Sequence, residues 1–418
     1  MARLALEQSP ASSLPRRFLL SAPLWGMFAG LLLIADGDLL LRSRWLPATL
    51  ALVHAFTLGV LGNAMFGSTL QFLPTAAGVR VRGTARFGPW LHASFNLGAI
   101  LLVAGWLAGW RAGVLAGGIV LPLAFMLLAA MTLPGLVMAG GQRLLHAGFV
   151  TALGSALLAA LFGGCLALGA GGWLGMALPA LTDVHASWGI LGWVMVLMAS
   201  VGRVVMPMFQ GTRTVPAVAQ AIWLGSLPLA LGAGAWQRLG YDDASVLRLV
   251  LAIYALSFAG AGLWLQRQAP RPRRGPLRLS WMVGWTLLAL AAATLLAGTR
   301  GGRLAAVLGL GIALPLMVNG MLLEIVGFLG WIGLHRHIGR GVQLPGVQRL
   351  LPATDKIRVL LAQLLLALLL PAAVLWPSPW LARSAGLAML LAWLGVWLAC
   401  LGVSRRTKRF RLTMESRP

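Results

Sequence analysis

The sequence predicts an all-α integral membrane protein, a polytopic bundle of about twelve transmembrane helices. Three observations carry this prediction: 59% of the 418 residues are hydrophobic, only 10% are charged, and the mean hydropathy is +0.86. A soluble domain needs about 25% charged residues to face water, so lipid has to be the solvent of this chain. The apolar runs are also too long and continuous for the alternating pattern of an outer-membrane barrel.

The apolar segments are long enough to cross roughly 30 Å of bilayer hydrocarbon, which takes about 20 helical residues. No connection between them has the length and polarity of a separate soluble domain. We therefore expect one transmembrane domain over residues 1–418, with histidine-bearing helices in 18–215, further helices in 216–403 and a basic tail at 404–418. The predicted spans are 18–34, 47–73, 88–109, 113–138, 144–168, 183–208, 216–235, 247–266, 280–298, 304–332, 357–377 and 383–403.

The distribution of charge predicts the orientation. A net charge of +24 would indicate nucleic-acid binding in a soluble protein, but here the bases lie in short connections, where Lys and Arg set membrane orientation. With the N-terminus inside, most bases fall on the inner side, including those of 267–279 and the tail. We predict cytoplasmic termini in a bacterial-type inner membrane, with lipid and not nucleic acid as the partner. The outer connections hold acids: Asp36, Asp38, Asp183, Asp242 and Asp243.

Four of the six histidines lie in the first turns of apolar spans. An ionisable side chain inside a membrane is costly unless it has a partner, so each is a candidate for function. In the predicted topology His54 and His185 lie toward the outer leaflet, and His92 and His146 lie toward the inner leaflet. Imidazoles from facing helices can ligate a b-type haem, so we expect spans two and six to pack together. Hydrogen bonding at the interface is the alternative for each histidine.

Two stretches of the N-terminal region are alike. HAFTLGVLGNAMFGSTLQFLP begins at His54 and HASWGILGWVMVLMASVGRVVMP begins at His185, and both continue with spaced glycines to a proline. The separation between His54 and His92 is also nearly that between His146 and His185. Together these features predict an internal repeat.

Other polar residues in the spans are few. Glu324 is the only carboxylate well inside an apolar span, and Asn319 lies five residues before it. A buried carboxylate is neutral or paired and often marks a proton or ion path; a neutral glutamic acid bonded across a helix interface is the alternative. The spacing of His335 and His337 could bind a metal, but the nearby arginines predict a solvated loop. Arg203, near the inner end of span six, is expected to reach the interface, and pairing with a haem propionate is the alternative.

The stretch from His54 to Gln71-Phe-Leu-Pro74 resembles the second helix of proteins related to subunit I of the haem-copper oxidases. The stretch from His185 through Gly192-Trp193 to Pro207-Met208-Phe209 resembles a helix of small homologues of that subunit. The similar NnrS-type proteins, linked to nitric-oxide responses, also have about twelve spans with haem and copper. The resemblance covers about residues 20–215, and it implies low-spin haem b at His54 and copper at His185.

The later spans depart from the oxidase pattern. An oxidase has a His-His pair on its seventh span and two histidines on its tenth, whereas span seven here has none, and His335 and His337 lie at the wrong end of span ten. A complete binuclear centre is therefore not expected. The sequence predicts a haem-binding redox or nitric-oxide-related protein, with one or two haems or one haem and a copper. Its expected partners are a redox protein or quinone and a diatomic gas; a transporter without haem is the alternative.

Overall fold

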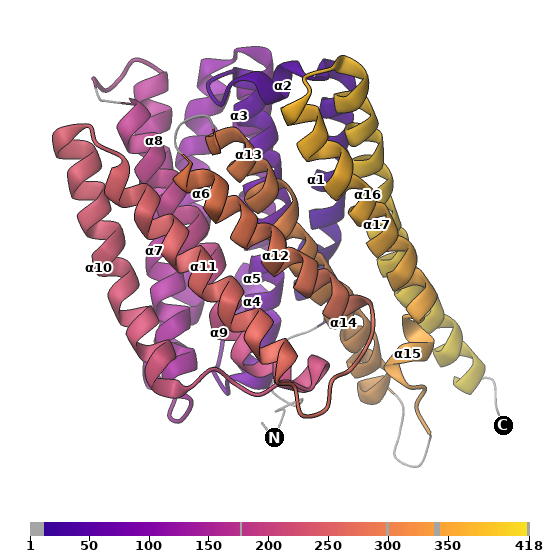
Figure 1. Ribbon diagram of the computed structural model, residues 1–418. Helices are drawn as coiled ribbons and strands as arrows, with labels where there is room; N and C mark the ends of the chain where they lie inside the picture. Colours follow the sequence, from indigo (N-terminus) through magenta and orange to yellow (C-terminus); the bar gives the residue numbers. More distant parts are fainter. Residues whose placement is uncertain (1–11, 176–177, 298–300, 338–342, 416–418) are drawn as a thin grey trace.

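The computed structural model describes residues 12–175, 178–297, 301–337 and 343–415. Within these ranges, twelve helical spans are long and apolar enough to cross a membrane, and they coincide with the twelve predicted segments. This confirms the all-α bundle. The helix α1 (Ser13–Asp36) begins, and α17 (Pro379–Glu415) ends, at the same end of the bundle (Figure 1). We call this the near end and the opposite one the far end.

Several spans are composed of consecutive α-helical and π-helical pieces, the latter labelled η. Span two is α3 (Pro47–His54), η2 (Ala55–Gly62) and α4 (Asn63–Ala76). Span six is α8 (Leu178–Ser187), η3 (Trp188–Met195), α9 (Val196–Val205) and η4 (Met206–Gln210). Span ten is α13 (Gly302–Ala306), η6 (Val307–Ala313) and α14 (Leu314–His337). The other spans are α1, α5 (Thr84–Ala108), α6 (Arg111–Met138), α7 (Arg143–Ala170), α10 (Ala217–Tyr241), α11 (Ser245–Arg267), α12 (Pro276–Leu296), α16 (Ala353–Leu375) and α17, with short α2 (Leu39–Arg42) and α15 (Val347–Leu350) in connections.

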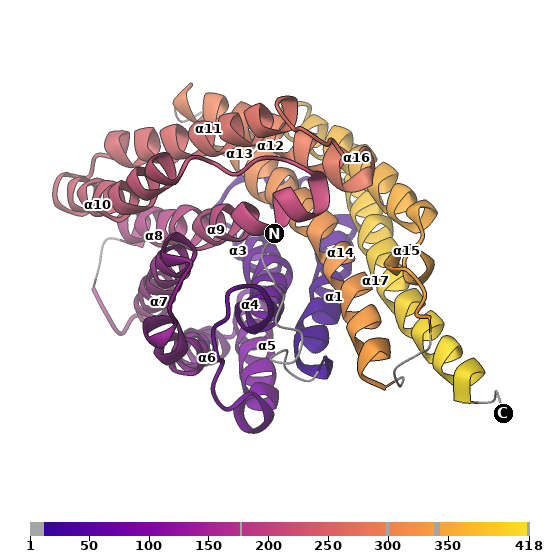
Figure 2. The same ribbon diagram turned by 90° about the horizontal axis from the view of Figure 1, so that it is seen from below.

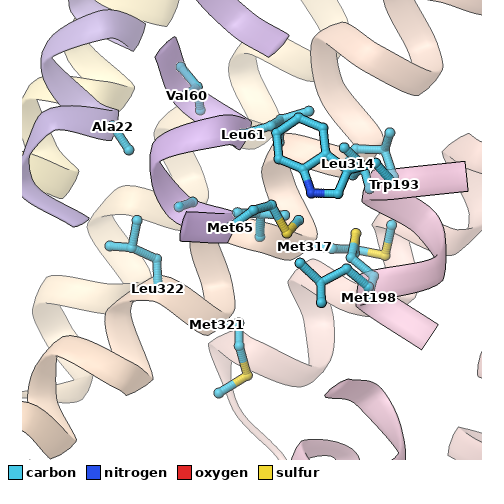
Figure 3. Packing of buried hydrophobic residues seen from close by; sticks show 14 of the residues in the cluster. Ala22, Val60, Leu61, Met65, Trp193, Met198, Leu314, Met317, Met321 and Leu322 are labelled. Carbon is cyan, nitrogen blue, oxygen red and sulfur yellow. The ribbon is translucent and has the colours of Figure 1, made fainter. Parts of the chain in front are cut away.

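Spans two, six and ten form the centre of the bundle. In their most apolar windows 67%, 67% and 72% of residues are buried, more than in any other described span. Met65, Met198 and Met317, one from each of these spans, lie in one buried cluster (Figure 3). Each of the three spans also contains π-helical turns, which frequently occur at functional sites. The three central spans, two, six and ten, are thus spaced four spans apart along the chain.

The last span packs along the first. A Cβ on Gly30 would lie 2.6 Å from the backbone nitrogen of Leu390, and a Cβ on Gly386 would lie 2.8 Å from that of Ile34. Only glycine permits so close a crossing, and small residues at helix contacts are typical of membrane proteins. On the side of the bundle away from α17 lies α10 (Figure 2).

The two ends of the bundle differ in composition. The basic connection between α11 and α12 lies at the near end with both chain ends (Figure 1). At the far end, exposed tryptophans lie in or next to the connections that follow odd-numbered spans. Tryptophan is favoured in the headgroup layer of a membrane. These residues are Trp45, Trp110, Trp173, Trp236, Trp376 and Trp380.

The predicted basic tail at 404–418 is not a separate segment as far as the structure describes it. The helix α17 continues from the last span to Glu415 without a break. Arg406 anchors this extension, because its guanidinium donates to the Asp355 carboxylate at 2.7 Å and to the Leu350 carbonyl at 2.8 Å.

Candidate functional site

His54 and His185 lie face to face in the bundle. Their ring centres are 6.3 Å apart and their planes are inclined by 28°. His54 is the last residue of α3 and His185 lies in α8, so both are in the half of the bundle nearer the far end. The expectation that spans two and six bring these two rings close together in the same half of the bundle is confirmed, but the two spans meet through side chains and do not pack closely along their backbones.

Each of these rings is anchored through Nδ1. The Nδ1 of His54 is 2.7 Å from the Leu50 carbonyl oxygen, and the Nδ1 of His185 is 2.8 Å from the Ala159 carbonyl oxygen on α7. A carbonyl oxygen only accepts, so both Nδ1 atoms carry the proton and donate. Both Nε2 atoms therefore keep their lone pairs. Metal-ligating histidines are typically oriented in this way, with the second ring nitrogen donating to a carbonyl.

Small residues make room for the His185 ring. A Cβ on Gly163, one turn after Ala159 on α7, would lie 3.1 Å from Cε1 of His185. A side chain at this position would press on the imidazole and change its direction. Gly163 thus positions the ring together with the Ala159 carbonyl.

Span two is held after His54 by a polar network that joins the first three spans. Asn63 and Asn96 exchange two hydrogen bonds, each of 3.0 Å. Asn63 also donates to the Gly59 carbonyl at 2.8 Å, and the Trp25 indole donates to Asn96 at 3.1 Å. These bonds hold span two against spans one and three.

An ion-pair network ties the two histidine-bearing spans together at the far end. Asp183, two residues before His185, accepts from Arg44 at 2.6 Å and from Arg238 at 2.9 Å. Arg44 lies in the connection that leads into α3, and Arg238 also pairs with Asp242. Sequence reasoning treated Asp183 only as an outer acid; its position two residues before a candidate ligand is the signal that could have singled it out.

We expect Asp183→Asn to lower the free energy of unfolding by about 1–3 kcal/mol. The Arg238 side chain is only 9% exposed, and the substitution leaves its buried charge with one carboxylate fewer. Arg44→Gln should cost less than about 1 kcal/mol, because Arg44 is 55% exposed and such pairs are weak. Thermal unfolding of the purified protein measures both effects. Arg42→Gln, which removes a comparably exposed pair with Asp38, is the control; equal losses in all three variants would contradict the network's role.

The structure does not bring His92 and His146 together as it does the outer pair. The Nε2 of His92 is 2.9 Å from the Ser21 hydroxyl, and its ring packs edge-on against Phe18. The Nε2 of His146 donates to the Ala77 carbonyl at 3.1 Å. Each has the kind of hydrogen bond that the alternative role predicts, and ligation of a second haem by this pair stays a prediction.

Two further histidines lie near the end of α14. His335 is exposed and its ring centre is 5.3 Å from that of Trp331. The side chain of His337 lies outside the part that the structure describes. Within the described part, no group of three or more histidine, cysteine or acidic side chains is arranged to hold a metal ion. A metal site within the described part of the chain would therefore depend on a pair of protein ligands.

Glu324 has a partner from the neighbouring span. The Lys356 ammonium lies 2.6 Å from its carboxylate, and the two side chains are 15% and 13% exposed. Both line a cavity of about 20 Å³ between α12, α14 and α16, together with Asn319 and Gln363. Asn319 is buried, and neither polar atom of its side chain has a hydrogen-bond partner among the described residues. The cavity is large enough for about one water molecule, which would satisfy that amide.

Arg203 is engaged within the protein. Its guanidinium donates to the Val215 carbonyl at 2.8 Å and to the Gln220 side chain at 2.7 Å. It therefore ties the end of span six to the start of α10, and does not simply extend to the interface as expected.

Neither a protein-family model nor a curated protein sequence matches this chain.

Proposed function

We propose that this chain is a haem-binding membrane protein in which His54 and His185 would together hold one b-type haem. The observation that carries the proposal is the pair of facing imidazoles with ring centres 6.3 Å apart. Both are oriented through Nδ1 and both have an unprotonated Nε2. The resemblance of span two to an oxidase-like helix supports haem at His54, whereas for His185 the resemblance implies copper.

The separation suits one metal ion between two imidazoles. A metal–nitrogen bond to histidine is about 2 Å long, so two imidazoles this close together could both hold one metal ion through their Nε2 atoms. The geometry therefore favours bis-histidine ligation over the haem-and-copper division that the resemblance implies.

Ligation by two imidazoles bears on the kind of chemistry. A haem held there would supply a one-electron couple, and both His54 and His185 would be engaged in holding it. This favours electron transfer to or from a redox protein or a quinone. The chain's own contribution is to hold both Nε2 atoms in place through the Leu50 and Ala159 carbonyls.

Absorption spectroscopy of the purified protein, expressed with ample haem and reduced with dithionite, tests the proposal. We expect sharp alpha and Soret bands, one haem per chain and no stoichiometric copper. Copper bound together with one haem would instead favour haem at His54 and copper at His185. A well-folded protein with neither haem nor copper would contradict the redox function.

We propose that the near end faces the cytoplasm of a bacterial-type inner membrane, because the basic connections gather there. Fusions of a reporter at Arg274 and after Arg411 should then be active only with a reporter that works in the cytoplasm. Activity of a periplasmic reporter at either position would reverse the orientation.

A transporter is the second candidate, and the polar cavity between α12, α14 and α16 favours it. Buried polar groups around the ion pair of Glu324 and Lys356 are the kind of feature that marks ion or proton paths in membranes. This candidate would lead if no haem or copper were found. Transport assays of Asn319→Leu, which keeps the ion pair, would then be the first test.

A further inference from the structure

A second cavity opens at the near end, away from the histidines. It has a volume of about 430 Å³ and lies between the start of α1, the end of α14 and the last turns of α17. Binding sites for small molecules have volumes of roughly 300–1,000 Å³. We call this cavity the basic pocket, because four basic side chains line it: Arg16, Arg405, Lys408 and Arg411.

Three of the four bases of this pocket have no acidic partner in the described part of the chain. In the described part of the chain, no carboxylate lies within ion-pair distance of Arg16, Arg405 or Lys408, and no acidic residue lines the pocket. Arg406 differs, since it is paired with Asp355 at 2.7 Å. Cations held together without a counter-charge attract an anion, and Arg binds phosphate especially well.

One wall of the basic pocket is apolar. Val326, Leu329 and Leu334 of α14 line it beside the charged side chains. An inorganic anion would gain nothing from contact with these apolar side chains, whereas a phospholipid has hydrocarbon next to its charged phosphate. Basic pockets between transmembrane helices bind anionic head groups in this way.

We infer that the basic pocket binds the phosphate of an anionic phospholipid, with Arg16, Arg405 and Lys408 at the phosphate and the acyl chain along α14. The unbroken extension of α17 brings two of these bases over the membrane surface. The lipid would link α17 to α1 and α14 where the three helices separate at the near end.

Lipid binding to the purified full-length protein tests this inference. Phosphatidylglycerol and phosphatidylcholine with the same acyl chains are titrated separately, and the melting midpoint and the lipid retained in native mass spectra are recorded. We expect phosphatidylglycerol to raise the midpoint and to be retained, and phosphatidylcholine to do neither. Inorganic phosphate is the third arm. If it stabilises the protein and displaces phosphatidylglycerol at equal concentration, the ligand is a soluble phosphate compound and the lipid assignment is overturned.

Two variants locate the site. Arg405→Gln combined with Lys408→Gln should weaken phosphatidylglycerol binding by at least about tenfold, since each base near an anionic lipid contributes appreciably. Gly333→Leu keeps every charge but fills the pocket, because a Cβ on Gly333 has no neighbour within 4 Å; it should weaken binding to a similar extent. Arg349→Gln with Arg409→Gln removes the same charge from exposed positions outside the pocket and should leave binding unchanged.

The same variants can refute the site. Equal weakening in the Arg349 and Arg409 control would mean that lipid follows overall charge and not this pocket. Unchanged binding in a folded Gly333→Leu protein would mean that the cavity is not where the lipid lies. Either result overturns the inference and leaves the haem proposal untouched, because no residue of the basic pocket contacts His54 or His185.

Discussion

His54→Ala should abolish the alpha and Soret bands of the reduced protein. Replacing imidazole with a methyl group removes the bond to the metal outright, whereas loss of a hydrogen-bonding group would cost on the order of 1 kcal/mol and leave the spectrum as it was. The spectrum of the purified variant, with its haem content and its melting midpoint, is the measurement. A folded His54→Ala protein with unaltered bands would show that the haem lies elsewhere.

The other histidines supply the comparison. With bis-histidine ligation, His185→Ala should lose the bands as His54→Ala does; if His185 holds copper, the bands persist and copper is lost. His92→Ala and His146→Ala should together remove a second haem signal only if the inner pair is also a site. Exposed His335 is the matched control, and neither His335→Ala nor His337→Ala should change the spectrum.

Glu324→Gln should lower the free energy of unfolding by about 3–5 kcal/mol, because it leaves the Lys356 ammonium without its counter-charge. The carboxylate lies 2.6 Å from that ammonium, and both side chains are mostly buried. Unfolding of the variant in increasing denaturant measures the loss. Lys356→Met, which strands the carboxylate instead, should cost a similar amount.

A double variant that lacks both charges distinguishes a structural role of the Glu324–Lys356 ion pair from a functional one. Glu324→Leu combined with Lys356→Met should recover most of the stability, since buried ion pairs can be replaced by packed apolar residues at little cost. If the double variant is stable but fails in transport or proton uptake, the pair has a functional role. A loss below about 0.5 kcal/mol in Glu324→Gln would show that water already reaches the pair, as for exposed ion pairs.

Most of the architecture could be predicted from the sequence because a transmembrane span is a local property. About 20 consecutive apolar residues suffice to define one, and all twelve predicted segments appear as helices. The bias of Lys and Arg toward alternate connections predicts the orientation of the spans, and it too can be recognised without knowing which spans contact each other. The common depth of His54 and His185 was predicted by counting spans from the N-terminus, and the short distance between the two rings agrees with that prediction.

Only the tertiary structure decided which side chains meet. Hydropathy along a span does not specify how the helix is rotated about its axis or which distant helix it faces. Whereas the Leu50 carbonyl that orients His54 lies one turn earlier on the same helix, the Ala159 carbonyl that orients His185 lies on a different span and depends on that rotation. The pairing of Glu324 with Lys356 and the convergence of three helices on the basic pocket depend on it as well. Sequence alone therefore determined the spans and their depths, whereas the geometry of the two facing histidines and both cavities required the packing of helices far apart in the chain.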